Sequence, residues 1–327
     1  MTPEALDRAA DVLRDAGRVA IACHVNPDAD ALGSMLGLAH HLVARGTPVT
    51  CAYPNQPQRL PRWSEMLPGL DLLVPPERFP SAPDVMVTCD CASFDRLGVL
   101  GPAANAASEL IWIDHHRSND GVGTIRLVDP DASSTCEVVM RLLDRIGGEL
   151  TEASALCLYA GLVTDTGRFQ YEAVTPETLR VAARLREHAF DHAQLSQVLY
   201  EDHRAAYLRL LGTALGRLQE LPDADLVWTY LLRSDLADAG LGVGETDDLI
   251  DVIRTVRGAD VAAVLKQQRD GRFKVSVRSR GGHDLAVAAA AFGGGGHRLA
   301  AGYTSQHGPA ATIEALVAVL AGEPVPS

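Results

Sequence analysis

The chain has 327 residues, enough for two domains of ordinary size. It is 47% apolar and 22% charged, as soluble globular proteins are, and its formal charge of −13 argues against the broad basic face of proteins that follow long nucleic acid. No apolar run is long enough to cross a bilayer, and the N-terminal residues lack a signal-peptide pattern. We therefore expect a cytoplasmic protein without a membrane partner.

The first part of the sequence alternates between helix and strand patterns. We predict a helix over residues 1–17, a buried strand over 18–23, a helix from about residue 31 to Gly46 and a strand over 48–53. Helices that alternate with strands at this spacing favour a mostly parallel sheet flanked by helices, which is an α/β fold.

Chemically distinctive residues follow the strand ends directly. Two more strands are predicted over 84–89 and 110–113, and His24, Asp90 and Asp114 come just after the first, third and fourth strands. Parallel sheets bind ligands at the carboxyl ends of their strands. We therefore expect these three residues at one edge of the sheet.

The middle of the chain marks the domain limits. A buried helix over 151–163 leads to Asp165, and a more polar helical stretch follows over 186–215. We predict a catalytic domain over 1–185, a helical connector over 186–215 and a substrate-binding domain over 216–327.

The last domain is predicted to be a smaller α/β domain. Its expected elements are a strand over 226–232, a helix over 246–256, strands over 261–268 and 273–279, and a helix over 285–291. Asp-Gly between the two later strands is a hairpin signal. The final helix runs into a glycine-rich loop, Gly-Gly-Gly-Gly-His.

Acidic and imidazole side chains gather at the predicted sheet edge. They are His24, Asp28, Asp30, Asp90, Asp114, His115, His116 and Asp165. Such a cluster is costly unless a cation compensates it, and a pair of divalent ions is the simplest explanation. Carboxylates with a few imidazoles suit Mn²⁺ or Mg²⁺ better than zinc. Asp90 is the candidate bridging ligand because its strand is expected to be central, and the chemistry expected of such a pair is phosphoryl-group hydrolysis.

The order of these motifs resembles the DHH phosphoesterase family. The motifs are His-x-x-x-Asp-x-Asp from His24, the single Asp90, Asp114-His115-His116, Thr-Asp-Thr-Gly around Asp165, and the distant Gly-Gly-Gly-Gly-His that ends at His297. That family includes RecJ exonuclease, family II inorganic pyrophosphatase and exopolyphosphatase. The length and the two-domain layout are most similar to the NrnA group of bifunctional oligoribonucleases and pAp phosphatases. The resemblance covers essentially the whole chain.

The resemblance implies a ligand set for two divalent metal ions. The first ion would be bound by His24, Asp28 and Asp90, and the second by Asp30, Asp90, His115 and Asp165. Mn²⁺ is the expected metal, with Mg²⁺ or Co²⁺ as alternatives. Asp114 would orient its neighbours, and His116 would face the scissile phosphate as electrophile or general acid. The resemblance also implies a homodimer.

A second set of residues would hold the substrate. Gly294, Gly295, Gly296 and His297 would bind a phosphate, because backbone N–H groups of a glycine-rich loop can approach an anion closely. Arg278 and Ser279, at the end of the preceding strand, are further candidates, since the planar guanidinium binds two oxygens. Ser134 and Thr135 could add hydroxyl contacts.

The implied function is metal-dependent hydrolysis of very short oligoribonucleotides, including linear dinucleotides such as pApA of cyclic-dinucleotide metabolism, and removal of the 3′-phosphate of pAp. The expected partners are short RNAs or nucleotides rather than long nucleic acid. One alternative is an inorganic pyrophosphatase or exopolyphosphatase, although pyrophosphatase has a different basic motif in place of the glycine loop. The other is a nucleotide-binding regulator with a decayed site, which the intact ligand positions disfavour.

Overall fold

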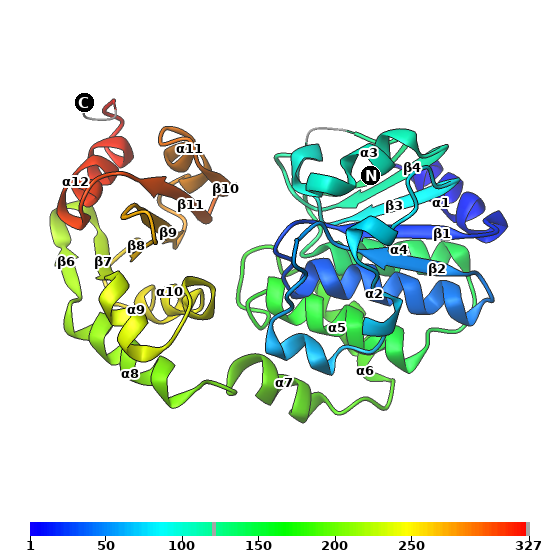
Figure 1. Ribbon diagram of the computed structural model, residues 1–327, viewed down its shortest axis with the longest axis horizontal. Coiled ribbons are helices and arrows are strands. Elements are labelled where there is room, and N and C mark those ends of the chain that lie inside the picture. Colours follow the sequence, from blue (N-terminus) through cyan, green and yellow to red (C-terminus); the bar gives the residue numbers. More distant parts are fainter. Residues whose placement is uncertain (120–121, 325–327) are drawn as a thin grey trace. The chain divides into compact units, whose positions relative to one another are not determined.

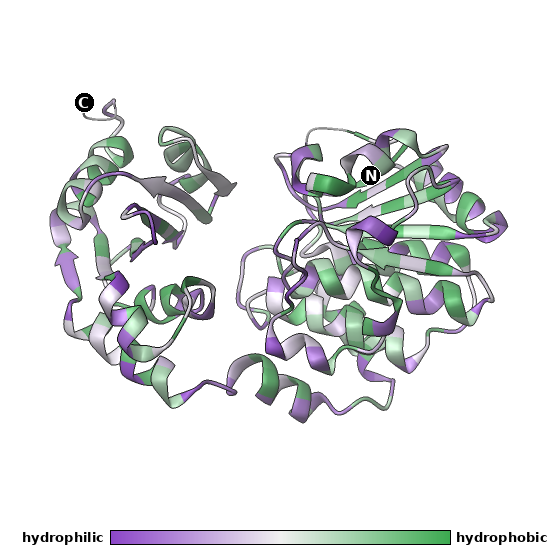
Figure 2. Cartoon of the chain, in the orientation of Figure 1, coloured by the Kyte–Doolittle hydropathy of each residue, from purple (hydrophilic) through white to green (hydrophobic). Residues whose placement is uncertain are grey.

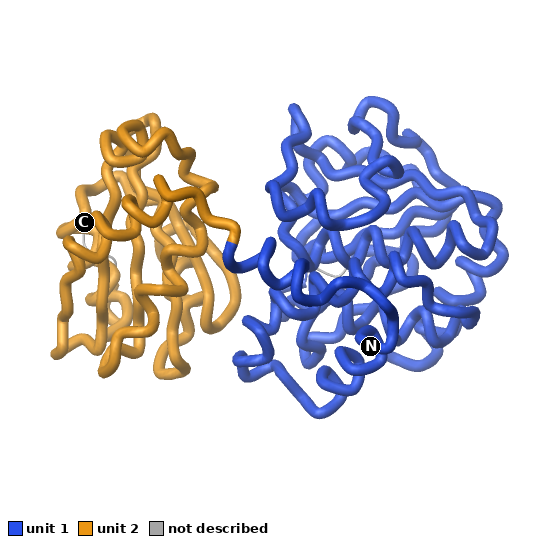
Figure 3. Tube along the Cα trace, turned by 90° about the horizontal axis from the view of Figure 1, so that it is seen from below, with its two compact units in different colours: residues 1–201 blue, residues 202–327 orange. Residues whose placement is uncertain are grey.

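The computed structural model describes residues 1–119 and 122–324, and the chain divides into two compact units, Met1–Glu201 and Asp202–Ser327 (Figure 3). Each unit has its own sheet and its own core. The division falls inside the stretch expected to be a helical connector. There α7 (His192–Tyr200) belongs to the first unit and α8 (Ala205–Gly216) to the second.

A five-stranded parallel sheet forms the middle of the first unit (Figure 1). Its strands are β1 (Val19–Cys23), β2 (Val49–Ala52), β3 (Val85–Cys89), β4 (Glu109–Asp114) and β5 (Ile125–Val128), in the order β2-β1-β3-β4-β5. β1 and β3 are buried along their whole length, as strands covered on both faces are. The predicted parallel α/β fold is confirmed, and β3, which precedes Asp90, is the central strand as expected.

Helices cover both faces of this sheet. One face packs against α1 (Pro3–Asp15), α2 (Ala29–Ala44), α4 (Thr135–Ile146) and α5 (Glu152–Asp165), with α6 (Pro176–Arg186) outside them. The other face packs against η4 (Phe94–Leu100) and α3 (Gly101–Ala106). Three short 3-10 helices, η1 (Arg62–Met66), η2 (Leu70–Leu72) and η3 (Pro76–Arg78), connect β2 to β3. Hydrophobic residues fill the strands and the inward helix faces (Figure 2).

The carboxyl ends of β1, β3 and β4 lie side by side at one edge of the sheet. Cys23 at the end of β1 is in register with Cys89 at the end of β3, and Cys89 is in register with Ile113 of β4. The strand order reverses between β1 and β3, because β1 connects to β2 on one side and the later strands lie on the other. Ligands of open α/β sheets bind at such a reversal.

The second unit contains a six-stranded mixed sheet. Its strands are β6 (Gln219–Leu221), β7 (Leu226–Leu231), β8 (Val261–Gln267), β9 (Phe273–Ser279), β10 (Gly295–His297) and β11 (Ala300–Ser305), in the order β10-β11-β9-β8-β7-β6. β7 and β8 are parallel, and the other pairs are antiparallel. The predicted hairpin between β8 and β9 is confirmed. The glycine run is not wholly a loop, since its second half forms the edge strand β10.

Helices cover this second sheet from two sides. α8, α9 (Arg233–Ala239) and α10 (Leu249–Ile253) share one core cluster with β7 and β8, whereas α11 (Leu285–Ala290) and α12 (Pro309–Leu320) share the other with β8, β9 and β11. Short 3-10 helices lie at η5 (Pro222–Ala224) and η6 (Val243–Thr246). The helix expected over 246–256 is shorter, because η6 precedes it and α10 ends at Ile253. Over the described residues, no helix combines the length and apolarity needed to cross a bilayer.

Candidate metal centre

His24 is buried just beyond β1, with one ring nitrogen directed at carboxylates. Its Nε2 lies 3.3 Å from Asp90 Oδ2 and 3.8 Å from Asp28 Oδ2. Its Nδ1 lies 2.8 Å from the Val25 carbonyl oxygen. Arg96 Nη2 also lies 2.7 Å from Nδ1, so protein groups occupy Nδ1 and leave Nε2 as the nitrogen that can bind a cation.

Asp28 both begins helix α2 and faces His24. Its Oδ1 accepts hydrogen bonds from the backbone N–H groups of Asp30 (3.1 Å) and Ala31 (3.0 Å), as a helix N-cap does. Its Oδ2 is the oxygen near His24. The N-cap contact therefore sets the direction of the second oxygen.

Close packing of α2 on α5 brings Asp30 towards Asp165. Asp30 lies in the first turn of α2, and Asp165 is the last residue of α5. A Cβ on Gly161 of α5 would lie 2.9 Å from the Asp30 Cα, and one on Gly33 of α2 would lie 2.4 Å from the Cys157 carbonyl oxygen. The two helices can approach this closely only because both positions are glycine.

Asp90 stands between two groups of side chains. Its backbone is left-handed, with φ of 61°, and its N–H donates to the Ile113 carbonyl of β4 over 2.9 Å. Oδ2 is the oxygen near His24, whereas Oδ1 lies 3.8 Å from His115 Nε2. The two oxygens of one buried carboxylate thus face different histidines.

The two histidines after β4 both lie near Asp90 Oδ1, His116 Nδ1 at 3.6 Å and His115 Nε2 at 3.8 Å, but their nearest carboxylates differ. His115 Nε2 lies 3.3 Å from Asp165 Oδ2 and 4.0 Å from Asp30 Oδ2. His116 instead places Nδ1 2.7 Å from Oδ1 of Asp114, which is fully buried. Asp114 thus holds the ring of His116 through its Oδ1.

These side chains form two adjacent groups suited to hard divalent cations. The ligand atoms of His24, Asp28 and Asp90 lie within 4.8 Å of one another, and so do those of Asp30, His115 and Asp165. The ligand atoms of Asp90, Asp114 and His116 form a third such group. Carboxylate oxygens with one imidazole in each of the first two groups are donors that suit Mn²⁺ or Mg²⁺. The residues present therefore fit a pair of such ions.

Burial and mutual repulsion shift the pKa values in this site. Burial favours neutral His24, but hydrogen bonds with Asp28 and Asp90 outweigh it and raise the pKa of His24 to about 10. Burial, together with the Asp90 carboxylate, raises the pKa of Asp30 to about 6. Burial and repulsion by Asp30 and Asp90 raise the pKa of Asp165 well above its usual value. Without a cation, protons compensate part of this negative charge.

In the second unit, the partly buried Asp260 organises the loop that follows Arg278. The hydroxyl of buried Ser279 donates to Asp260 Oδ2 over 3.0 Å, and His283 Nδ1 lies 2.8 Å from the same oxygen. The N–H of Gly282 donates to Asp260 Oδ1 over 3.0 Å. Ser279, the last residue of β9, therefore shapes the loop through its hydroxyl, and the half-exposed Arg278 precedes it on the same strand.

The glycines before His297 differ in the space that a side chain would have at each position. Gly294 has no room for a side chain, because its Cβ would lie 2.2 Å from the Gly302 carbonyl oxygen. Gly296 is equally restricted, by the Ala300 carbonyl oxygen at 2.4 Å. A Cβ on the exposed Gly295 would meet nothing within 4 Å in the described part of the chain. Packing therefore explains why Gly294 and Gly296 are glycines, but it does not explain Gly295.

Several residues around the site were not expected, or were expected in another role. The hydroxyl of Ser134 caps α4 by accepting from the Glu137 N–H, and the hydroxyl of Thr135 donates to Asp90. Neither is thus an obvious substrate contact. Asn119 donates to Asp114 Oδ2 over 2.7 Å, and Arg96 Nη2 lies 2.7 Å from His24 Nδ1. No pattern in the sequence singles out these last two residues.

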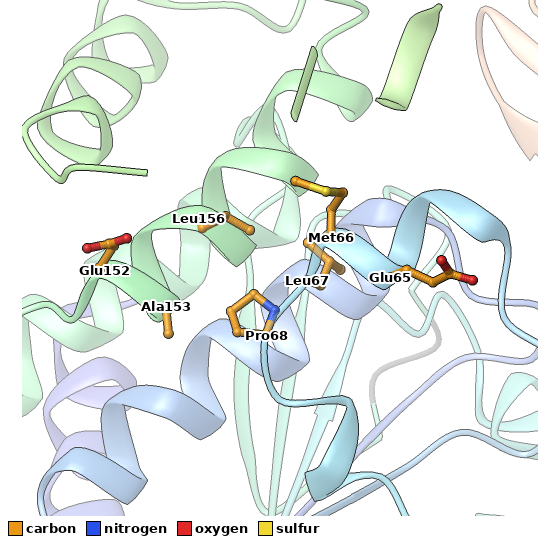
Figure 4. Close-up of a pocket in the computed structure, with 7 residues that line it drawn as sticks. All are labelled: Glu65, Met66, Leu67, Pro68, Glu152, Ala153 and Leu156. Atoms are coloured by element: carbon orange, nitrogen blue, oxygen red, sulfur yellow. The ribbon is translucent and has the colours of Figure 1, made fainter. Parts of the chain in front are cut away.

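The first unit also has a surface pocket of about 450 Å³ (Figure 4). Its lining comes from η1, the residues after it and the first turns of α5: Glu65, Met66, Leu67, Pro68, Glu152, Ala153 and Leu156. Asp165 is at the opposite end of α5, roughly 20 Å away along a helix of this length. The pocket is therefore separate from the metal-binding residues.

Two family models match the chain. The model of the DHH family, N-terminal domain, matches residues 18–162, and the model of the DHHA1 domain matches residues 227–322. The two matches fall in the first and second units respectively.

Two curated proteins are similar to this chain over most of their own length. The bifunctional oligoribonuclease and PAP phosphatase NrnA of Thermus thermophilus is 36% identical over 289 residues, which cover 88% of this chain and 84% of that protein. The protein of the same name from Bacillus subtilis is 29% identical, over 85% of this chain and 86% of that protein.

Among solved structures, an exopolyphosphatase-related protein from Bacteroides fragilis matches with a TM-score of 0.89 and 25% identity, over 96% of this chain and 94% of that one. RecJ from Thermus thermophilus in complex with Mn²⁺ matches with a TM-score of 0.57 and 19% identity, over 99% of this chain and 56% of that one. The second likeness concerns the fold alone.

Proposed function

The chain belongs to the DHH family, and on that basis we propose that it is a metal-dependent phosphoesterase that hydrolyses very short oligoribonucleotides, including pApA, to mononucleotides and removes the 3′-phosphate of pAp. The observation that carries the proposal is the meeting of six expected ligands at one sheet edge, with the two oxygens of Asp90 turned to different histidines.

The proposed cofactor is a pair of Mn²⁺ ions. His24, Asp28 and Asp90 would hold one ion, and the other would be held by the remaining ligands, Asp30, His115 and Asp165, together with the second oxygen of Asp90. When bound, the two ions supply Lewis-acid polarisation of a phosphoryl oxygen and lower the pKa of water.

His116 is the proposed proton donor to the leaving oxygen. Burial lowers its pKa, but the hydrogen bond to Asp114 and the charge of Asp90 outweigh this and raise the pKa of His116. The raised pKa favours the protonated form of the ring. Because Nδ1 is held by Asp114, a proton given to substrate must come from Nε2. Asp114 acts by fixing that orientation.

The second unit is proposed to bind a phosphate of the substrate. Arg278 offers a planar guanidinium on β9. Gly294, Gly295, Gly296 and His297 lie in or next to β10, which β11 separates from β9, and the backbone of β10 is exposed. Gly295 supports this role. No neighbouring protein atom requires a glycine there, so the open space beside it can hold a ligand. Ser279 would contribute through the loop that its hydroxyl holds against Asp260.

A substrate panel with Mn²⁺ tests the function. We expect turnover of pAp, pApA and a pentanucleotide RNA, and little turnover of pyrophosphate, polyphosphate or long single-stranded RNA. Preferred hydrolysis of pyrophosphate or polyphosphate would favour the alternative activity within the same family. Metal binding without turnover of any member would favour a nucleotide-binding regulator.

Removal of the central carboxylate tests the site. Asp90→Asn keeps the shape of the side chain, and we expect it to lower hydrolysis by more than about a hundredfold, because it removes a ligand from both metals. Asp144→Asn is the matched control, since Asp144 forms a half-exposed ion pair with Arg184. An Asp90→Asn enzyme with normal activity would refute the site.

Location and assembly are also proposals. We propose a cytoplasmic homodimer, as the family resemblance implies. Light scattering of the purified protein measures the assembly, and a monomer at working concentrations would refute it.

A further inference from the structure

Two metal-binding carboxylates share one partner, the first residue of helix α4. The backbone N–H of Thr135 donates to Asp30 Oδ2 over 2.6 Å, and its hydroxyl donates to Asp90 Oδ1 over 2.8 Å. The next N–H, from Cys136, donates to Asp30 Oδ1 over 3.0 Å. Asp30 comes from α2 and Asp90 from the end of β3, so a single residue ties together two distant segments of chain.

The start of α4 is itself held firmly. Ser134 caps the helix, and Glu137 accepts hydrogen bonds from the Ser133 N–H and hydroxyl and from the Thr178 hydroxyl. All four of these residues and Thr135 are buried. A residue fixed in this way can impose a position on the carboxylates that it contacts.

We propose that Thr135 is a positioning residue of the metal centre, which aligns Asp30 and Asp90 for metal binding. The inference rests on the proposed metal-dependent function. Each carboxylate oxygen has two acceptor sites, so a hydrogen bond at one site fixes the orientation and leaves the other for a cation. The charge of Asp30 is further favoured by its place at a helix N-terminus.

The hydroxyl contact of Thr135 distinguishes a positioning role from simple capping of helix α4. The N–H contacts with Asp30 also satisfy the first amides of α4, which any buried helix start requires. The hydroxyl contact with Asp90 has no such use for the helix, because Ser134 already provides the cap. Removing only the hydroxyl therefore tests the proposal.

The experiment compares three full-length variants by calorimetric titration of the metal-free protein with Mn²⁺. Thr135→Val keeps the shape and loses the hydroxyl, and we expect its Mn²⁺ affinity to fall roughly 10- to 100-fold, as for other residues that orient metal ligands. Thr135→Ser keeps the hydroxyl and should stay within about threefold of the unchanged protein.

The matched control is Thr88→Val. Thr88 is buried on β3, two residues before Asp90, and its hydroxyl has no hydrogen-bond partner in the described part of the chain. This variant removes a buried hydroxyl from the same strand and should leave Mn²⁺ affinity unchanged. If Thr135→Val does not fold, Thr135→Ser and Thr135→Cys repeat the comparison, because the thiol is similar in size and a weaker donor.

Kinetics provide the second readout. A positioning role predicts that Thr135→Val regains its kcat as Mn²⁺ is raised, with the KM for pAp unchanged. Equal Mn²⁺ affinity in Thr135→Val and the unchanged protein overturns the inference while leaving the proposed function intact. Failure of the unchanged protein to bind divalent metal overturns both.

Discussion

Adjacent histidines can serve different purposes when different atoms of their rings are held. Asp114 fixes Nδ1 of His116, whereas Nε2 of His115 faces Asp165 and Asp30. The family resemblance implies different roles for the two imidazoles, a ligand and an acid. In the structure their rings have different nearest carboxylates, which supports that proposal.

His116→Asn tests this separation. We expect a fall in kcat of about 10²- to 10⁴-fold, the range in which general acids contribute, with Mn²⁺ affinity kept. His115→Asn should weaken Mn²⁺ binding itself. Steady-state kinetics at saturating metal, together with calorimetry, distinguish the two variants. Similar losses of metal affinity in both would contradict the assignment.

Gly295 provides a second test at the scale of single residues. Gly295→Ala adds a methyl group where the protein itself has room, so we expect normal stability but a KM for pAp raised roughly tenfold, which corresponds to about 1.4 kcal/mol. Gly294→Ala should instead destabilise the second unit by roughly 1–3 kcal/mol, because its methyl meets the Gly302 carbonyl. Thermal unfolding and kinetics measure both. An unchanged KM in Gly295→Ala would argue against a ligand there.

The sequence sufficed to predict that His24, Asp90 and Asp114 lie at one sheet edge, because a parallel sheet gathers the residues that follow its strands. His24, Asp90 and Asp114 needed only three correctly predicted strands to be placed at one edge. Thr135 and Asn119 act through hydrogen bonds to those residues. Such contacts depend on side-chain geometry, which residue spacing does not reveal.

The elements α4, β5 and β10 were not predicted, because their local sequence signals are weak or because tertiary contacts outweigh them. α4 was not predicted, although Ser134 followed three residues later by Glu137 is a capping pattern and buried residues recur along it at helical spacing. β5 is four residues long and includes an exposed Arg126. β10 is mostly glycine, which disfavours strands, and exists because β11 pairs with it. Tertiary contacts decide such segments.

The elements that meet at the sheet edge place His24 beside carboxylates, and this makes the predicted Mn²⁺ affinity depend on pH. In the metal-free protein His24 holds a proton up to its pKa of about 10, whereas a metal ligand must be neutral. Metal binding must therefore release that proton. We expect Mn²⁺ affinity to rise with pH below that value, by about tenfold per unit for each proton released.

Calorimetry in buffers of different ionisation enthalpy counts the released protons directly. The same pKa predicts the sign of the stability effect: the favourable contribution of protonated His24 in metal-free protein is complete below its ordinary pKa of 6.5 and is lost as pH rises through about 10. Mn²⁺ affinity that is constant from mildly acidic to mildly alkaline pH would contradict this linkage.

At the scale of the whole molecule, each unit has its own sheet and its own hydrophobic core. The first unit surrounds its parallel sheet with two core clusters, and the second has two clusters of its own on either side of its sheet. Every proposed metal ligand belongs to the first unit, and the proposed phosphate-binding residues belong to the second. Metal binding and substrate binding should therefore be separable.

A fragment of residues 1–201 tests this separation. We expect it to fold and to bind Mn²⁺ with an affinity close to that of the full chain, while its hydrolysis of pAp falls by more than about a hundredfold, since a lost phosphate contact of charge-assisted strength costs several kcal/mol. Circular dichroism and calorimetry check the folding and the metal. Full activity of the fragment would show that the second unit is not needed.

The N-cap contact of Asp28 has a consequence for the speed of metal loading. That contact, those of His24 Nδ1 and the backbone bond of Asp90 are all made by the protein alone, so the ligands are already in place when an ion arrives. Loading then requires the ion to shed water and the site to release protons, rather than the chain to rearrange. Rapid mixing of metal-free protein with Mn²⁺ should show a rate that rises in proportion to ion concentration, without the plateau that a preceding change of shape imposes.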